Sequence, residues 1–89
     1  MSTDKRIVLK QIGAKIAYFR TLVGISQTEL ANRIKATQST VSKVESGNYN
    51  DNLSISMLTD IANALDIDLA LLLSFTGYEK AMWEKKISI

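Results

Sequence analysis

The sequence predicts an all-α protein, a compact bundle of five helices followed by a short C-terminal tail. Apolar residues recur three and four positions apart along most of the chain, which is the spacing of one face of a helix. The 89 residues include no proline and only four glycines, too few for a chain of turns and short strands. The hydrophobic content of 46% is ample for a helical core.

The first predicted helix runs from about Val8 to Val23 and ends at Gly24, a residue that suits the left-handed position after a helix. Four apolar residues at helical spacing form its buried face: Ile12, Ile16, Phe19 and Val23. Three basic residues lie near its start, and a frayed, solvated terminus explains them better than a basic arm that contacts DNA phosphate: Lys5, Arg6 and Lys10.

The segment from Ser26 to Ile34 predicts a second, shorter helix. Ser26 and Glu29 have the spacing of a capping box, in which each side chain bonds the backbone N–H of the other residue. The apolar residues of this segment form a buried stripe: Leu30, Ala31 and Ile34.

The third predicted helix begins after Thr37, a good N-cap, and ends at Ser46. Val41 and Val44 lie three apart and face inward. Polar side chains are left on the outer face: Gln38, Ser39, Ser42, Lys43 and Ser46. Two short helices with a polar outer face on the second are typical of a helix-turn-helix, which places its second helix in the major groove of DNA. Glutamine, serine and lysine side chains suit the edges of bases.

Two further helices are expected after residue 53. The fourth starts near Ser54 and buries Ile55, Leu58, Ile61, Ala62 and Leu65. Residues 67–75, IDLALLLSF, favour a fifth helix with Asp68 as its N-cap, and it buries Leu69, Leu72 and Leu73. The alternation within this segment also permits a strand. Leu71 and Phe75 exceed what a small core can bury, which indicates a subunit contact.

Residues 76–89 form a tail outside the predicted bundle, so we divide the chain into a domain at 1–75 and a tail at 76–89. Tyr78 and Met82 are four apart with Trp83 beside them, which predicts a short amphipathic helix. Folding back on its own domain or on a dimer mate is favoured over docking a different protein. The candidates for a dimer contact are Leu71, Phe75, Tyr78, Met82 and Trp83.

Charge is distributed unevenly along the chain. Residues 1–50 carry eight basic and three acidic side chains, whereas residues 51–89 carry three basic and six acidic ones. The net charge of +2 is too small to indicate nucleic-acid binding by itself. A positive half that contains the predicted helix-turn-helix is nevertheless expected if one face meets phosphate.

These motifs together resemble the Cro/cI family (lambda repressor-like, XRE) of DNA-binding domains in bacterial and phage regulators. The resemblance runs from about Ile12 to Leu73 and rests on four motifs in order: I-x-x-x-I-x-x-F-R at 12–20, G-I-S-Q-x-E-L-A at 24–31, T-Q-S-T-V-S-K-V-E-S-G at 37–47 and I-A-x-A-L at 61–65. It implies a compact bundle of about five helices, a reading head at 26–47 and a third helix that enters the major groove.

The resemblance also implies roles for single residues. Bases are read by Gln38, Ser39, Ser42 and Lys43. The resemblance assigns phosphate contacts to Gln27 and Ser46, and we expect further ones from Lys35, Thr37 and Asn48. Arg20 and Glu45 form a structural ion pair that joins the end of the first helix to the end of the third.

The chain departs from the family pattern at three places. Lys35 and Asp66 occupy positions where the family commonly has glycine after the second and fourth helices. A left-handed conformation at Lys35 costs on the order of 1 kcal/mol, so a differently built turn is an alternative there. The segment that follows the third helix, Asn48 to Asn52, is longer than usual and has no lysine or arginine.

Composition excludes several classes of protein. Without histidine or cysteine the chain lacks the usual general base, the usual nucleophiles and the softer metal ligands, so we expect no enzyme, no metal and no cofactor. The longest apolar run, Leu69 to Leu73, is too short to cross a bilayer, and no targeting signal is present. We therefore expect a cytoplasmic protein without a membrane partner.

Two functional classes agree with the sequence. The first is a transcriptional regulator, most simply a repressor, that binds double-stranded DNA as a homodimer at an inverted repeat. The alternative is an antitoxin of a toxin–antitoxin pair, whose tail binds a second protein; a regulator could also bind a partner such as an anti-repressor. A domain that has lost DNA binding is disfavoured by the polar side chains of Gln38, Ser39 and Lys43.

Overall fold

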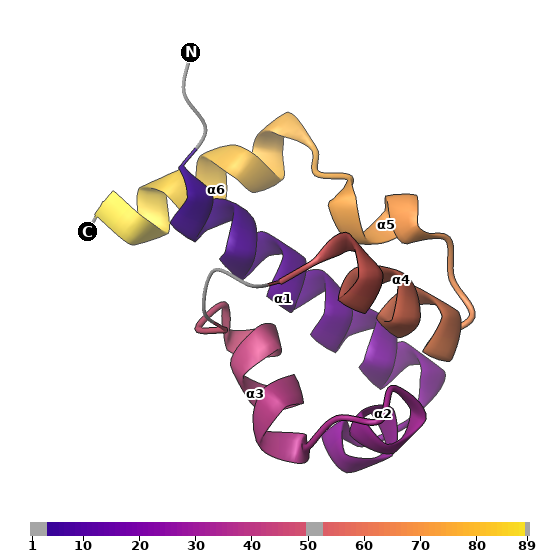
Figure 1. The fold of residues 1–89 in the computed structure, drawn as a ribbon. Helices are drawn as coiled ribbons and strands as arrows, with labels where there is room; N and C mark the ends of the chain where they lie inside the picture. Colours follow the sequence, from indigo (N-terminus) through magenta and orange to yellow (C-terminus); the bar gives the residue numbers. More distant parts are fainter. Residues whose placement is uncertain (1–3, 50–52, 89) are drawn as a thin grey trace.

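The computed structural model describes residues 4–49 and 53–88, and within these ranges it contains six helices and no strand (Figure 1). They are α1 (Lys5–Val23), α2 (Gln27–Arg33), α3 (Gln38–Ser46), α4 (Ile55–Ala64), α5 (Leu69–Leu73) and α6 (Gly77–Ser88). The all-α prediction is confirmed, with the tail adding a sixth helix. The strand alternative for residues 67–75 is wrong because Asp68 starts a helix, its carboxylate accepting from the backbone N–H of Ala70 at 2.9 Å.

The long α1 helix is the element around which the others are arranged. In Figure 1, α3 lies on one side of it, α4 and α5 lie on the other, and α2 packs near its C-terminal end. The core takes side chains from each of the first five helices and from Leu65, the C-cap of α4: Ile12, Ile16, Leu30, Ala31, Val41, Val44, Leu58, Ile61, Ala62, Leu65 and Leu72. These residues include most of the predicted apolar stripes.

Helix α1 begins three residues earlier than predicted. Asp4 is its N-cap and accepts from the backbone N–H of Arg6 at 2.9 Å, while its other carboxylate oxygen pairs with the Arg6 guanidinium. These hydrogen bonds to Arg6 lower the pKa of Asp4. The expectation of a frayed terminus is therefore wrong for Lys5, Arg6 and Lys10, because a carboxylate at the positive end of the helix stabilises the first turn.

Three predicted core residues are instead exposed. Val23, Ile55 and Leu73 are 45%, 64% and 41% exposed, and each lies at the first or last position of its helix. Helical spacing identifies a face, but the end of a helix can extend past the neighbour that would cover it. Conversely, Gln11 and Gly13 are buried where α1 meets the rest of the bundle.

Gly13 shows how closely α1 and α3 approach. A Cβ atom at this position would fall inside the contact distance of the backbone carbonyls of Val44 and Glu45. The absence of a side chain at Gly13 therefore sets the spacing between α1 and the predicted recognition helix.

The turns after α2 and α4 have the geometry that glycine usually supplies. Lys35 and Asp66 have φ of 59° and 56°, both in the left-handed region. In each turn the backbone N–H of the third residue after the helix donates back into the helix: Ala36 to the Ala31 carbonyl at 2.9 Å, and Ile67 to the Ala62 carbonyl at 3.0 Å. The alternative of a differently built turn at Lys35 is therefore wrong.

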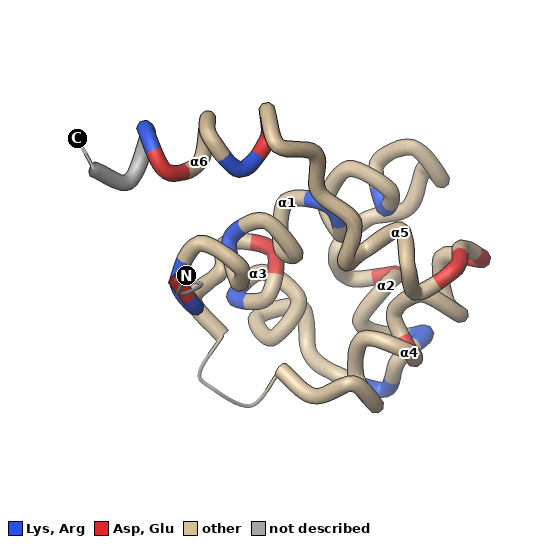
Figure 2. Tube along the Cα trace, turned by 90° about the horizontal axis from the view of Figure 1, so that it is seen from above, with Lys and Arg blue, Asp and Glu red and all other residues tan. Residues whose placement is uncertain are grey.

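The tail folds back on its own domain as α6. Thr76 and Glu79 form a complete capping box, with N–H to side-chain distances of 3.0 and 3.2 Å. Glu79 also pairs with Lys15 of α1 at 3.0 Å. Both views place α6 along the N-terminal half of α1, and acidic and basic residues alternate on it (Figure 1; Figure 2).

Neither a membrane-spanning helix nor a metal-binding cluster is found in the described residues. In residues 4–49 and 53–88 no helix is both long enough and apolar enough to cross a membrane. In the same ranges no cluster of three or more acidic, histidine or cysteine residues is suited to holding a metal ion.

Candidate DNA-binding surface

Helix α3 presents a polar face to solvent. Val41 and Val44 point into the core and are 2% exposed. Four of the five polar side chains predicted on the outer face are exposed and Ser42 is half-buried: Gln38, Ser39, Ser42, Lys43 and Ser46. The structure thus brings together all four residues that were predicted to read bases.

The start of α3 is determined by its N-cap. The Thr37 hydroxyl accepts from the backbone N–H of Thr40 at 3.1 Å and lies 3.0 Å from the Thr40 hydroxyl. Capping of this kind satisfies a backbone donor that has no partner within the helix. Gln38 and Ser39 therefore occupy the first turn, which is the part of a recognition helix that contacts base edges.

An ion pair joins α1 to the end of α3. The Arg20 guanidinium contacts both carboxylate oxygens of Glu45, at 2.6 and 3.1 Å, and the two side chains are only 16% and 6% exposed. Its third nitrogen donates to the carbonyl of Ile25, at 2.8 Å, in the turn before α2. The hydrogen bond to Glu45 raises the pKa of Arg20. The predicted pair is present, and Arg20 also holds the turn that precedes α2 through its bond to Ile25.

Gln27 connects the Arg20–Glu45 pair to Gln38 on the polar face of α3. Its amide nitrogen donates to Glu45 at 2.9 Å, and its amide oxygen accepts from the Gln38 amide at 2.6 Å. Gln27 was predicted as a phosphate contact, but both ends of its half-buried amide are engaged within the protein. Sequence reasoning missed this role. The sequence pattern that could have predicted it is that Gln27 and Gln38 are the first residues of two successive helices.

The other predicted phosphate contacts occupy the two ends of α3. Lys35 precedes the helix in an exposed turn, while Asn48 follows it and donates its backbone N–H to the Lys43 carbonyl at 2.9 Å. The Ser46 hydroxyl donates to the same carbonyl at 3.1 Å. Within residues 4–49 and 53–88, Lys35 and Lys43 have no carboxylate partner, so both ammonium groups are open to an anion.

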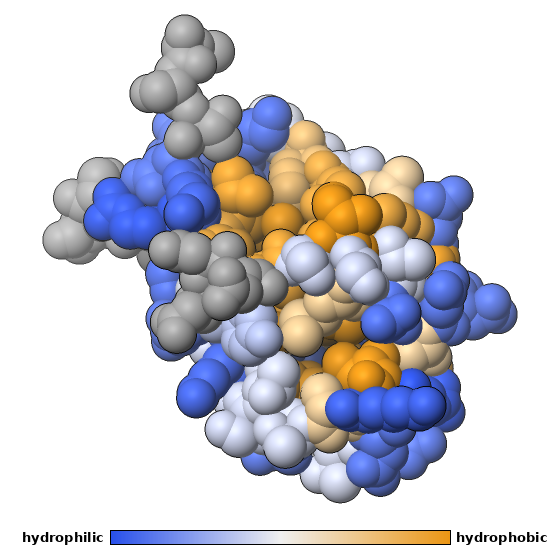
Figure 3. Space-filling view, in the orientation of Figure 1, coloured by the Kyte–Doolittle hydropathy of each residue, from blue (hydrophilic) through white to orange (hydrophobic). Residues whose placement is uncertain are grey.

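The predicted dimer residues divide into two groups. Leu71, Tyr78 and Met82 are exposed. Phe75 packs against the core beneath the Lys15 ammonium, 5.8 Å from the ring centroid, and Trp83 lines an open groove between α1 and α6. Hydrophobic surface gathers over α4 and α5 on the face drawn in Figure 3.

The sequence matches a family model described as helix-turn-helix over residues 16–72. The chain belongs to the Cro/cI-type helix-turn-helix family. The match includes the C-terminal part of α1, all of α2, α3 and α4, and most of α5. No curated protein matches this chain in sequence.

Two crystal structures resemble this Cro/cI-type chain. One is the restriction-modification controller protein C.AhdI from Aeromonas hydrophila, which is 33% identical with a TM-score of 0.72, over 79% of this chain and 99% of that chain. The other is a T36A mutant of the restriction-modification controller protein C.Esp1396I, 22% identical with a TM-score of 0.66, over 92% of this chain and 97% of that chain; it supports the fold. With its family and the polar face of α3, the protein is a DNA-binding transcriptional regulator, a class of protein that is typically not enzymatic.

Proposed function

We propose that this regulator is a homodimer that recognises an inverted-repeat operator and represses transcription by occluding a promoter. The observation that carries the proposal is the polar face of α3, whose first residue is held in place by a network that begins at Arg20. A preorganised side chain loses less conformational freedom on binding, which favours sequence-specific contacts.

The side chains of α3 match the chemistry of base edges. Gln38 uses one amide N–H for Gln27, which leaves its second N–H and its oxygen for the N7 and N6 atoms of adenine. Lys43 can donate to the O6 and N7 atoms of guanine. Phosphate contacts from Lys35, Thr37, Ser46 and Asn48 would then orient the protein on the duplex.

A dimer places two copies of α3 about 34 Å apart, on successive turns of the major groove. We assign the subunit contact to α5, because Leu71 and Leu73 are exposed on it and hydrophobic surface gathers over α5 and the adjoining α4 (Figure 3). Sedimentation measurements test this assignment. Leu71→Glu should give a monomer, whereas Leu22→Glu, an exposed leucine on α1, should leave the dimer intact. A dimeric Leu71→Glu variant would move the interface away from α5.

The likeness to C.AhdI covers almost all of that chain and suggests which genes this protein regulates. We extend the proposal to control of restriction-modification genes. The protein would then act in the cytoplasm without a cofactor, metal or catalytic activity. The antitoxin alternative is less well supported, because Glu79 and Trp83 of the tail are engaged with α1 of the same chain.

Selection from a random duplex pool is the direct test of the proposed function. The purified dimer should recover an inverted repeat with half-sites about 10 base pairs apart, and bind it about 10³-fold or more tightly than random DNA. Gln38→Ala should relax the preference at one base position of each half-site, while Ser56→Ala, an exposed serine on α4, should not. Recovery of no motif, with equal affinity for all duplexes, would refute sequence-specific regulation.

A further inference from the structure

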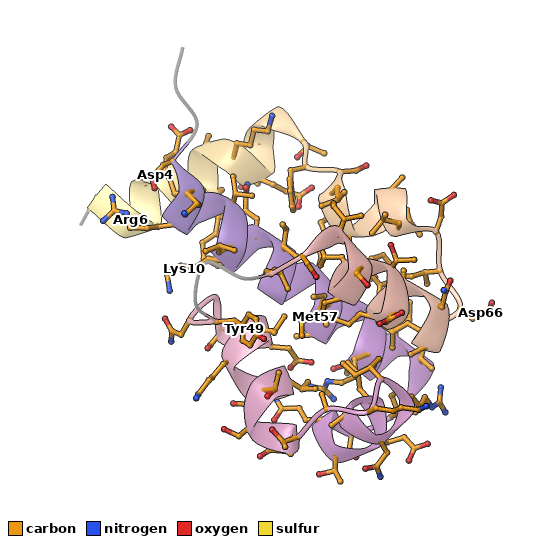
Figure 4. All side chains as sticks on the ribbon, in the orientation of Figure 1. Asp4, Arg6, Lys10, Tyr49, Met57 and Asp66 are labelled. Carbon is orange, nitrogen blue, oxygen red and sulfur yellow. The ribbon has the colours of Figure 1, made fainter. Side chains whose placement is uncertain are left out.

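Lys10 of α1 is packed against the C-terminal end of the recognition helix. Its ammonium lies 3.4 Å from the carbonyl oxygen of Ser46, which is the last residue of α3. A Cβ atom on Gly47 would collide with the Cα and Cγ atoms of Lys10, and Gly47 has a φ of 76°. Figure 4 shows Lys10 leaving α1 on the side where α3 ends, near Tyr49. The position of this lysine is therefore built into the junction of the two helices.

The last turn of α3 carries one basic side chain of its own, Lys43. The sequence contains no lysine or arginine between Lys43 and Lys80. The C-terminal end of a helix also carries a partial negative charge, which repels phosphate. Lys10 brings a further cation to this end from α1, and within residues 4–49 and 53–88 its ammonium has no carboxylate partner.

The length of α3 brings this end close to a phosphate backbone. Its nine residues span about 14 Å. The major groove is about 12 Å wide. When the first turn of α3 reaches base edges, the opposite end therefore lies beside the wall of the groove, where the phosphates are.

We propose that Lys10 is a DNA phosphate contact, with its ammonium bridging the Ser46 carbonyl and one backbone phosphate of the half-site. This inference rests on the proposed DNA binding and adds to it a cation from outside the helix-turn-helix. Because a phosphate is present at every step of the duplex, Lys10 contributes to affinity and not to base preference.

The test compares three variants of the full-length protein on the selected operator and on a random duplex, each over a series of salt concentrations. Lys10→Gln removes the charge but keeps most of the side-chain stem on Gly47, and Lys10→Arg keeps the charge. Lys80→Gln makes the same charge change on an exposed residue of α6. Thermal melting by circular dichroism confirms that each variant is folded.

We expect Lys10→Gln to weaken binding to both duplexes by a similar factor. The slope of log K against log salt should fall by about 0.9 for each lost phosphate contact, and Lys10→Arg should restore it. Lys80→Gln should leave the slope unchanged. An unchanged slope in Lys10→Gln, with a lower melting temperature, would mean that Lys10 only caps α3 and would overturn the inference.

Three other results would also overturn it. An equal loss of slope in Lys80→Gln would trace the effect to net charge rather than to the place of Lys10. Failure of the wild-type protein to bind any duplex would remove the proposed function and this inference together. If the wild-type protein binds the operator and Lys10→Gln binds it with the same affinity and the same salt slope, the inference alone is refuted and the proposed function stands.

Discussion

The side-chain amide of Gln38 donates to the side-chain oxygen of Gln27 at 2.6 Å, so the first residue of α3 is held by the first residue of α2. Gln27 is held in turn by Glu45, which pairs with Arg20 of α1. The orientation of Gln38, which we propose reads a base, therefore depends on the ion pair between α1 and the end of α3. This relationship separates the residues proposed to read DNA from the residues that position them.

Removal of Gln27 should reduce operator affinity even though Gln38 remains. Gln27→Ala is expected to cost about 1 kcal/mol of binding free energy, since Gln38 loses its internal partner. In a double-mutant cycle with Gln38→Ala, the two losses should be less than additive by roughly 0.5 kcal/mol or more. Thr28→Ala, an exposed neighbour, is the control. Strictly additive losses would mean that Gln27 contacts DNA independently of Gln38.

Loss of Arg20 should act first on stability. Arg20→Ala leaves the nearly buried Glu45 carboxylate without its partner, and we expect the free energy of unfolding to fall by about 3 kcal/mol. Arg33→Ala removes an exposed pair with Glu29 and should cost less than about 1 kcal/mol. Urea denaturation followed by circular dichroism measures both. Similar values for the two variants would contradict a structural role for the Arg20–Glu45 pair.

The close approach at Gly13 predicts a large effect from one methyl group. Gly13→Ala should force α1 and α3 apart, because the new Cβ atom would meet backbone carbonyls that cannot move independently, and cost about 3 kcal/mol. Gly77→Ala is the matched control, since its Cβ atom would enter open space at the start of α6. Its melting temperature should be unchanged or higher, because alanine favours helix. A stable Gly13→Ala variant would mean that the two helices are not tightly coupled.

The left-handed turn at Lys35 allows stability and DNA binding to be separated. Lys35→Gly removes a strained side chain and should raise the free energy of unfolding by up to about 1 kcal/mol. If Lys35 contacts phosphate, the same change should weaken binding to all duplexes alike. Asp66→Gly relieves the same strain on another turn and should leave DNA binding unchanged. Equal DNA affinities for the two variants would exclude Lys35 as a phosphate contact.

Acidification should release α6 from α1. The hydrogen bond from Lys15 and the capping bond to Thr76 lower the pKa of Glu79. The stabilisation is therefore complete above the unfolded-state pKa, about 4.3, and is lost as the pH falls through the lower folded-state pKa.

The single tryptophan, Trp83, reports on this change because it lines the groove between the two helices. Its emission should shift to longer wavelength in acid. In Glu79→Gln the shift should already be present at neutral pH and should not depend on pH in this range. A pH-dependent shift in that variant would assign the transition to another carboxylate.

Much of the fold could be predicted because its signals lie within a few residues of one another. Caps at Ser26, Thr37, Ser54 and Asp68 each accept a hydrogen bond within their own first turn. Apolar spacing located the core faces, including Val41 and Val44 of the recognition helix. The same local logic predicted which polar side chains of α3 face solvent.

Local signals failed where burial depends on a neighbour far along the chain. Ile55 has helical spacing with the core of α4 but lies at its exposed first position. The capping box at Ser26 is only half formed, since the Glu29 carboxylate accepts from Arg33 at 3.2 Å. Each outcome is decided by which partner is close enough in space.

The sequence by itself determined the helices, their caps, the polar face of α3 and the family, because each follows from bonds and spacing within one or two helical turns. Only the tertiary structure decided that Gln27 supports Gln38, that α6 returns to α1 through Glu79, and that Lys10 covers the end of α3. These contacts join residues that are 11, 64 and 36 positions apart. Their formation depends on how the helices pack and not on any local pattern.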